Sequence, residues 1–172
     1  MDENENYFSA IKEGDFRSVL ENEQLPNQHP YIQMLVNYVR EISEDVDRPT
    51  RKFFDPNKLR PLLPYICIYD VLYKDEDFYD AKLRLFGTEL VNVYGEVTGL
   101  NVSQYPVEGV SNRVMADCEL VIKTKKIVIG SVSSLDKEKN YIKLLKVLIP
   151  FFDHETDNNK ITQIVSLIQF NS

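Results

Sequence analysis

Apolar residues recur at every third or fourth position between residues 30 and 46, a spacing typical of a helix with one buried face. The stripe consists of Ile32, Leu35, Val36, Val39, Ile42 and Val46. Pro30 suits the first turn of such a helix, because the N–H that proline lacks has no partner there. Spaced apolar residues also predict helix over residues 6–24, so residues 1–46 are expected to form an N-terminal helical extension.

Five later segments are rich in β-branched and aromatic residues, as strands are. They cover residues 65–72, 81–86, 127–135, 141–152 and 161–170. Charged and polar clusters between them predict hairpin loops. A helical spacing of apolar residues returns over residues 107–123, at Val107, Val110, Val114, Cys118, Val121 and Ile122.

The order of these elements is helix, helix, two strands, short helices, one long helix and three strands. This order predicts an α+β domain over residues 47–172, in which helices of residues 86–123 pack on one face of a five-stranded antiparallel sheet. Gly87 allows the positive φ that a corner between strand and helix can need. Thr88 is expected to cap the helix that follows, and Gly95 to end it.

Composition and charge limit the classes of function. The chain has 172 residues, of which 43% are hydrophobic, enough for one domain with its own core. Its net charge of −7 disfavours nucleic acid as a partner. The absence of a signal sequence and of an apolar run of about 20 residues predicts a cytoplasmic protein with no membrane contact. Cys67 and Cys118 are expected to be buried free thiols.

The residues give little support for catalysis or metal binding. His29 lies in a predicted connection. Residues 153–157 place oxygen ligands at alternate positions, as a calcium loop does, but Asn158 and Ile164 replace its glycine and glutamate. An acidic hairpin turn is therefore favoured over a metal site, also for His154. No nucleophile–base pair or phosphate-binding glycine loop is present, so the chain is not expected to be an enzyme.

An ordered set of turn residues and short motifs runs through most of the chain. It comprises Pro49, Asp55-Pro56, Leu62-Leu63-Pro64, Arg84, Gly87-Thr88, Gly95, Thr98-Gly99 and Leu148-Ile149-Pro150. From about residue 30 to residue 170, this order resembles a family of small bacterial PAS-type domains. That family often has Trp in the helix before Pro49. This chain has no Trp, and Tyr38 is the nearest candidate for that position. The resemblance implies a stand-alone sensor or regulatory domain that binds a small molecule or a protein partner and acts through a separate output protein.

A small apolar or amphipathic ligand would lie between the long helix, the turn before it and the sheet. The candidate residues are Phe86, Val93, Val114, Cys118, Val121, Ile129, Ser131, Val147, Ile149 and Ser166. The alternative is that these side chains simply fill the core. Arg84 is a candidate anchor for an anionic ligand, although an ion pair with Asp70 of the neighbouring strand is favoured.

The cofactors of PAS-type sensors are disfavoured by the residues. A flavin photosensor needs a reactive cysteine in an Asn-Cys-Arg pattern after the second strand, and a haem sensor usually needs a histidine on the long helix. Neither is present. Two alternatives to a sensor stay open, namely a ligand-free dimerisation or adaptor module and a small α+β enzyme.

The stripe of residues 30–46 either covers the sheet within one chain or pairs with the same helix of a second copy. One helix is not expected to cover both the sheet face and the apolar residues of 7–20. A two-fold homodimer through residues 7–46 is therefore predicted.

Overall fold

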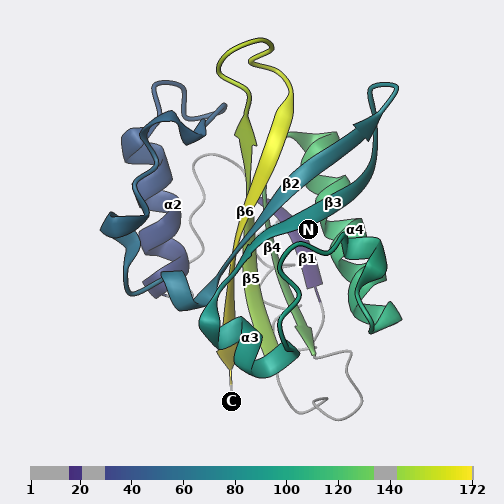
Figure 1. Ribbon diagram of the computed structural model, residues 1–172. Coiled ribbons are helices and arrows are strands. Elements are labelled where there is room, and N and C mark those ends of the chain that lie inside the picture. The colour runs from purple at the N-terminus through teal and green to yellow at the C-terminus, as the bar shows by residue number, and fades with distance from the viewer. Residues whose placement is uncertain (1–15, 21–29, 134–142, 172) are drawn as a thin grey trace, which may run out of the picture.

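One antiparallel sheet forms the centre of the molecule, with strand order β1-β4-β5-β6-β2-β3 (Figure 1). The computed structural model describes residues 16–20, 30–133 and 143–171. The strands are β1 (Phe16–Leu20), β2 (Ile66–Lys74), β3 (Asp77–Phe86), β4 (Ile127–Ser133), β5 (Lys143–Phe152) and β6 (Ile161–Asn171). The α+β class and the five predicted strands are confirmed.

The additional strand, β1, lies where the sequence predicts a helix. It pairs antiparallel with β4, from Phe16 opposite Ser131 to Leu20 opposite Ile127. A short apolar run does not distinguish strand from helix by its spacing alone, and the outer edge of β4 offers a row of backbone hydrogen-bonding groups. The helical prediction is therefore wrong for residues 16–20. The rest of residues 6–24 lies outside the described part of the chain.

Helix α2 (Pro30–Ile42) covers one face of the sheet (Figure 1). Its buried residues share a hydrophobic core with inward-facing residues of β2, β4, β5 and β6. They are Ile32, Leu35, Val36 and Val39. Each large side chain buried in this way stabilises the fold by about 1.5–3 kcal/mol. These four residues of the stripe thus cover the sheet within one chain, and they are not available as part of the surface on which the homodimer was predicted.

The helix ends at Ile42, earlier than the predicted residue 46, and Val46 is 53% exposed. Polar side chains after Ile42 bond to nearby backbone instead of continuing the helix. Ser43 Oγ donates to the carbonyl oxygen of Val39, and the Asp45 carboxylate accepts from the backbone N–H of Asp47 at 2.9 Å. Local bonds of this kind compete with helical hydrogen bonding.

Tyr38 ties α2 to the segment that leads into the sheet. Its hydroxyl accepts from the backbone N–H of Asp55 at 2.9 Å, and it donates to the Asp55 carbonyl oxygen at 3.3 Å. Its ring meets Phe54 edge-on at 5.8 Å between centroids. The segment contains three short 3₁₀ helices, η1 (Arg51–Phe53), η2 (Pro56–Leu59) and η3 (Leu63–Tyr65). The tyrosine therefore joins α2 to this segment through both its hydroxyl and its ring.

The opposite face of the sheet carries α3 (Thr88–Tyr94), η4 (Val102–Gln104) and α4 (Glu108–Thr124) (Figure 1). Buried residues of these elements share a second core with the alternate residues of the strands. The predicted helices of residues 86–123 thus pack on one face, as expected, while α2 packs on the other. Within the described residues, no helix combines the length and the apolar character needed to cross a membrane.

Gly87 has a different role from the one that the sequence suggested. Its φ is −63°, so no positive φ is needed, and it is the N-cap of α3, which makes Thr88 the first helical residue. A Cβ atom at Gly87 would lie 2.3 Å from the carbonyl oxygen of Pro64. The glycine is therefore required by the close approach of two backbone segments. Gly95 ends α3 at φ 84°, in the left-handed region that favours glycine, as predicted.

Candidate functional site

A cavity of about 70 Å³ lies between the sheet and the helices of the α4 side. The sheet contributes residues of β2, β3 and β5, and the helical side contributes residues of α3, η4, α4 and their connections. The lining residues are Tyr69, Leu83, Phe86, Tyr94, Val97, Val102, Tyr105, Val110, Ser111, Arg113, Val114, Leu144 and Lys146. A mostly apolar lining with a few polar groups is typical of small-molecule sites.

Polar side chains fix the helical wall of this cavity to the sheet. The carboxylate of Asp80 on β3, which is 4% exposed, accepts from the backbone N–H groups of Ala81 at 2.8 Å and Ser103 at 3.3 Å, and from the Ser103 hydroxyl. Ser111 Oγ on α4 donates to the Val102 carbonyl oxygen at 2.8 Å. These bonds join β3 to η4 and η4 to α4, so the wall is held by specific contacts as well as by apolar packing.

Three charged side chains meet at the cavity. Arg113 and Asp117 are one turn apart on α4, and Lys146 lies on β5. Lys146 Nζ donates to Asp117 Oδ2, and Arg113 Nε lies 3.8 Å from Asp117 Oδ1. The exposed fraction of the side chain is 1% for Asp117, 7% for Lys146 and 22% for Arg113. Charges buried to this extent need a partner, because removal from water costs several kcal/mol per ion.

Tyr69 and the two cysteines stay protonated at neutral pH. Burial, followed by the effect of the neighbouring thiols of Cys67 and Cys118, raises the pKa of Tyr69 well above its usual value. Burial also raises the pKa of Cys67 to about 12 and raises the pKa of Cys118 further. Both cysteines are buried free thiols, as predicted. Because the reactive species of cysteine is the thiolate, neither of them is an activated nucleophile.

The structure places some of the predicted pocket residues on the side of the cavity. Phe86 and Val114 line it. Cys118 and Val121 are fully buried in the core of the same side. Ser166 is 1% exposed and pairs in register with Cys67 and Leu148, which belong to that core. Val93 is half-buried on α3.

The remaining predicted residues lie on the other side of the sheet. Ile129, Val147 and Ile149 are buried in the core beneath α2. Ser131 of β4 is opposite Leu145, which belongs to that core as well. The sheet therefore separates these four residues from the cavity, and the predicted set does not form one pocket.

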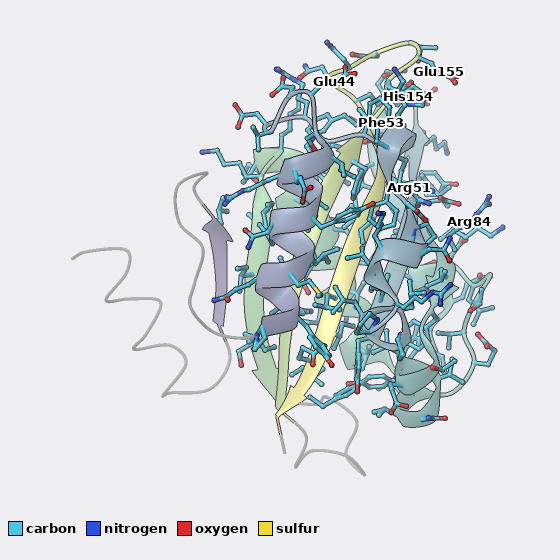
Figure 2. The ribbon with its side chains drawn as sticks, turned by 90° about the vertical axis from the view of Figure 1, so that its left-hand side faces the viewer. Glu44, Arg51, Phe53, Arg84, His154 and Glu155 are labelled. Carbon is cyan, nitrogen blue, oxygen red and sulfur yellow. The ribbon has the colours of Figure 1, made fainter. Side chains whose placement is uncertain are left out.

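Arg84 also lies away from the cavity, on the side of the molecule that carries α2, where Figure 2 shows it together with Arg51. Its Nη1 is 3.5 Å from Asp70 Oδ2, which is the ion pair that the sequence favoured. Asp70 Oδ1 accepts from Gln163 Nε2 at 2.6 Å, and Gln163 Oε1 accepts from Arg51 Nη1 at 2.9 Å. With a 68% exposed side chain, Arg84 belongs to a surface polar network.

The charged cluster was missed by the sequence reasoning, although a signal for it exists. Lys146 interrupts the apolar run of residues 144–152, and Asp117 stands next to Cys118 on the apolar side of α4. A charge placed in an otherwise apolar position is uncommon unless it is paired. Arg113, four residues before Asp117, is the matching cation on the same helix face.

The Asp153–Lys160 connection forms a turn that uses its own carboxylate. Asp153 Oδ1 accepts from the backbone N–H of Glu155 at 2.8 Å, and Oδ2 accepts from the Thr156 hydroxyl. The hydroxyl contact and the backbone contacts lower the pKa of Asp153. This is the polar hairpin turn that the sequence favoured. Within residues 16–20, 30–133 and 143–171, no three His, Cys, Asp or Glu side chains are arranged to hold a metal ion.

Comparison with known proteins gives a similar solved structure and a family. The chain is similar to the solved structure of an RNA-binding light-oxygen-voltage receptor, with 10% sequence identity and a TM-score of 0.49. The match covers 91% of this chain and 38% of that receptor. No curated protein matches the sequence. The family model for the PAS domain matches residues 27–166, which is most of the chain. The chain therefore belongs to the PAS domain family.

Proposed function

We propose that this PAS domain is a sensor or regulatory module that binds a small molecule in the cavity beside α4. The observation that carries the proposal is the cavity itself, which has a mostly apolar lining with a few polar side chains, among them Tyr69, Arg113 and Lys146. A lining of this composition is common in small-molecule pockets. The alternative is a ligand-free adaptor, for which the same side chains would only fill the core.

The ligand is expected to be small. Pockets for drug-sized molecules measure roughly 300–1,000 Å³, whereas this cavity holds about 70 Å³. The small volume supports a ligand smaller than a flavin or a haem, and the sequence favours neither cofactor. Cys67 and Cys118 are fully buried and carry raised pKa values, which suits structural cysteines better than a photoreactive one. Among the described residues that line the cavity there is no histidine for a haem iron.

A binding module suits the lining better than an enzyme does. Among the described residues that line the cavity, the titratable groups are tyrosines, Arg113 and Lys146. A general acid–base reaction needs groups whose pKa values lie near the working pH. The pKa of Tyr69 is raised, so it lies further from neutral pH than that of an ordinary tyrosine. The net charge of −7 supports partners other than nucleic acid. We also propose a cytoplasmic location, as the sequence analysis suggested.

Val114→Trp should abolish small-molecule binding while the domain stays folded. Val114 lines the cavity and is half-buried, so a larger side chain fills the space without replacing a fully buried residue. Hexan-1-ol and hexanoate serve as small probes, and the increase in melting temperature with probe concentration gives the affinity. Val46→Trp is the matched control, because Val46 is 53% exposed and does not line the cavity. Equal affinity in Val114→Trp and the unmodified chain would place the pocket elsewhere.

The homodimer stays a prediction, and the structure limits where its surface can lie. The inward stripe of α2 is buried against the sheet, whereas Met34 on the same helix is 44% exposed. If two copies pair through the outer side of α2, sedimentation at micromolar concentration should give twice the monomer mass. Met34→Asp should then give the monomer mass with unchanged unfolding. A folded monomer of the unmodified chain at that concentration contradicts the prediction.

A further inference from the structure

The charges at the cavity wall are of one sign. Arg113 and Lys146 line the cavity, and among its described lining residues there is no carboxylate. The carboxylate that both cations approach is that of Asp117, which is 1% exposed and lies behind the lining. A molecule that enters the cavity therefore meets two cationic side chains, in a protein whose net charge is −7.

The two cations relate to Asp117 in different ways. Lys146 Nζ makes a direct hydrogen bond to Oδ2. Arg113 Nε lies 3.8 Å from Oδ1, which is longer than a hydrogen bond. The guanidinium has five N–H donors in a planar fork that matches a carboxylate. Arg113 is also the more exposed of the two cations, with 22% of its side chain accessible, and it is therefore the better placed to meet an incoming anion.

We infer that the cavity selects a small monocarboxylate, with the carboxylate bound to Arg113 beside Lys146 and the apolar part against Leu83, Phe86 and Leu144. This inference rests on the proposed function, since it names the ligand class of the same cavity. The ligand carboxylate then lies beside the two cationic side chains that line the cavity. Hydrogen bonds between ionised groups are about twice as strong as neutral ones, and they gain further where water is excluded.

The size of the cavity limits the apolar part. A water molecule needs roughly 10–15 Å³ of comparable volume, so a space of about 70 Å³ holds only a few groups of that size. A short aliphatic or single-ring carboxylate suits this space. Long-chain fatty acids and nucleotides exceed it, and a neutral molecule of the same shape gains nothing from Arg113 and Lys146.

The test compares three probes that share one apolar chain, namely hexanoate, hexan-1-ol and hexylamine, by calorimetric titration of the full chain. Hexanoate should bind roughly tenfold or more tightly than hexan-1-ol, as one additional charge-assisted hydrogen bond provides, and hexylamine should bind weakest. Arg113→Gln should reduce the preference of the protein for hexanoate over hexan-1-ol to about twofold or less. Arg84→Gln is the matched control, because Arg84 lies across the sheet and should leave the preference unchanged.

A second variant keeps the test decisive if Arg113→Gln fails to fold. Arg113→Lys keeps a positive charge beside Asp117 but loses the planar fork of N–H donors, and it should also weaken hexanoate relative to hexan-1-ol. Equal or tighter binding of hexan-1-ol by the unmodified chain overturns the carboxylate inference and leaves the small-molecule pocket in place. Unchanged preference in both variants likewise overturns it. Binding of none of the three probes overturns both the inference and the proposed function.

Discussion

Asp117→Leu should lower the free energy of unfolding by about 3–5 kcal/mol. Asp117 is 1% exposed and accepts from Lys146, whose side chain is 7% exposed. The substitution leaves the lysine charge in an apolar core beside Arg113, and the cost of a buried charge that has lost its partner exceeds the gain from an added apolar side chain. Urea denaturation followed by circular dichroism measures the change.

A double variant distinguishes the cost of leaving Lys146 without the Asp117 carboxylate from the cost of losing both charges. Lys146→Met combined with Asp117→Leu replaces both charges by apolar groups of similar size, and such a replacement of a buried pair is often neutral or stabilising. Its free energy of unfolding should therefore lie much closer to that of the unmodified chain than either single variant does. Asp45→Asn is the surface control, because Asp45 and Arg48 are 53% and 45% exposed and their pair is worth less than about 1 kcal/mol. Additive losses in the double variant would contradict a buried pair.

Gly87→Ala should destabilise the domain by about 3 kcal/mol, at the upper end of the cost of overpacking. The added Cβ would lie 2.3 Å from the Pro64 carbonyl oxygen and 2.6 Å from the Leu63 carbonyl oxygen. Both atoms belong to the backbone, so no side-chain rotation relieves the contact. The backbone N–H of Gly87 also donates to the Ile66 carbonyl oxygen at 2.9 Å, which holds the two segments together.

The same denaturation experiment tests this prediction, with Thr88→Ala as its control. Thr88 is exposed, adjacent in sequence and without a capping role, so its substitution should change the free energy of unfolding by less than about 0.5 kcal/mol. If Gly87→Ala is as stable as Thr88→Ala, the close approach of the two segments is not a feature of the folded protein.

The sequence predicted those elements whose hydrophobic pattern is long and regular. The stripe of α2 and the helical face of α4 span several turns, and the strands from β2 to β6 are separated by clear polar clusters. The N-terminal strand β1 was not predicted, because its five residues are too few for a period to be recognised. Its conformation depends on β4, which follows more than a hundred residues later and offers the hydrogen bonds.

The cavity was less predictable than the fold. Residues 143–152 of β5 are almost continuously apolar, and a strand buried on both faces shows no alternation that identifies its two sides. From the sequence, Val147 and Ile149 are therefore as plausible as pocket residues as Leu144 is. Only the strand register shows that Leu144 lies on one face of the sheet and that Val147 and Ile149 lie on the other. Lys146 could have identified the cavity face of β5, since a charged residue in an apolar strand is expected to face an oppositely charged side chain.

Strand β5 contributes residues to both faces of the sheet, and so to the core beneath α2 and to the cavity side. Leu145, Val147 and Ile149 support α2, while Leu144 and Lys146 line the cavity on the other side. Protein interiors are close-packed and transmit displacement rather than absorbing it. In the proposed function, a ligand that displaces Lys146 would act on the same strand whose alternate residues pack against α2. We therefore expect α2, on the opposite face of the sheet, to be the element that responds to ligand binding.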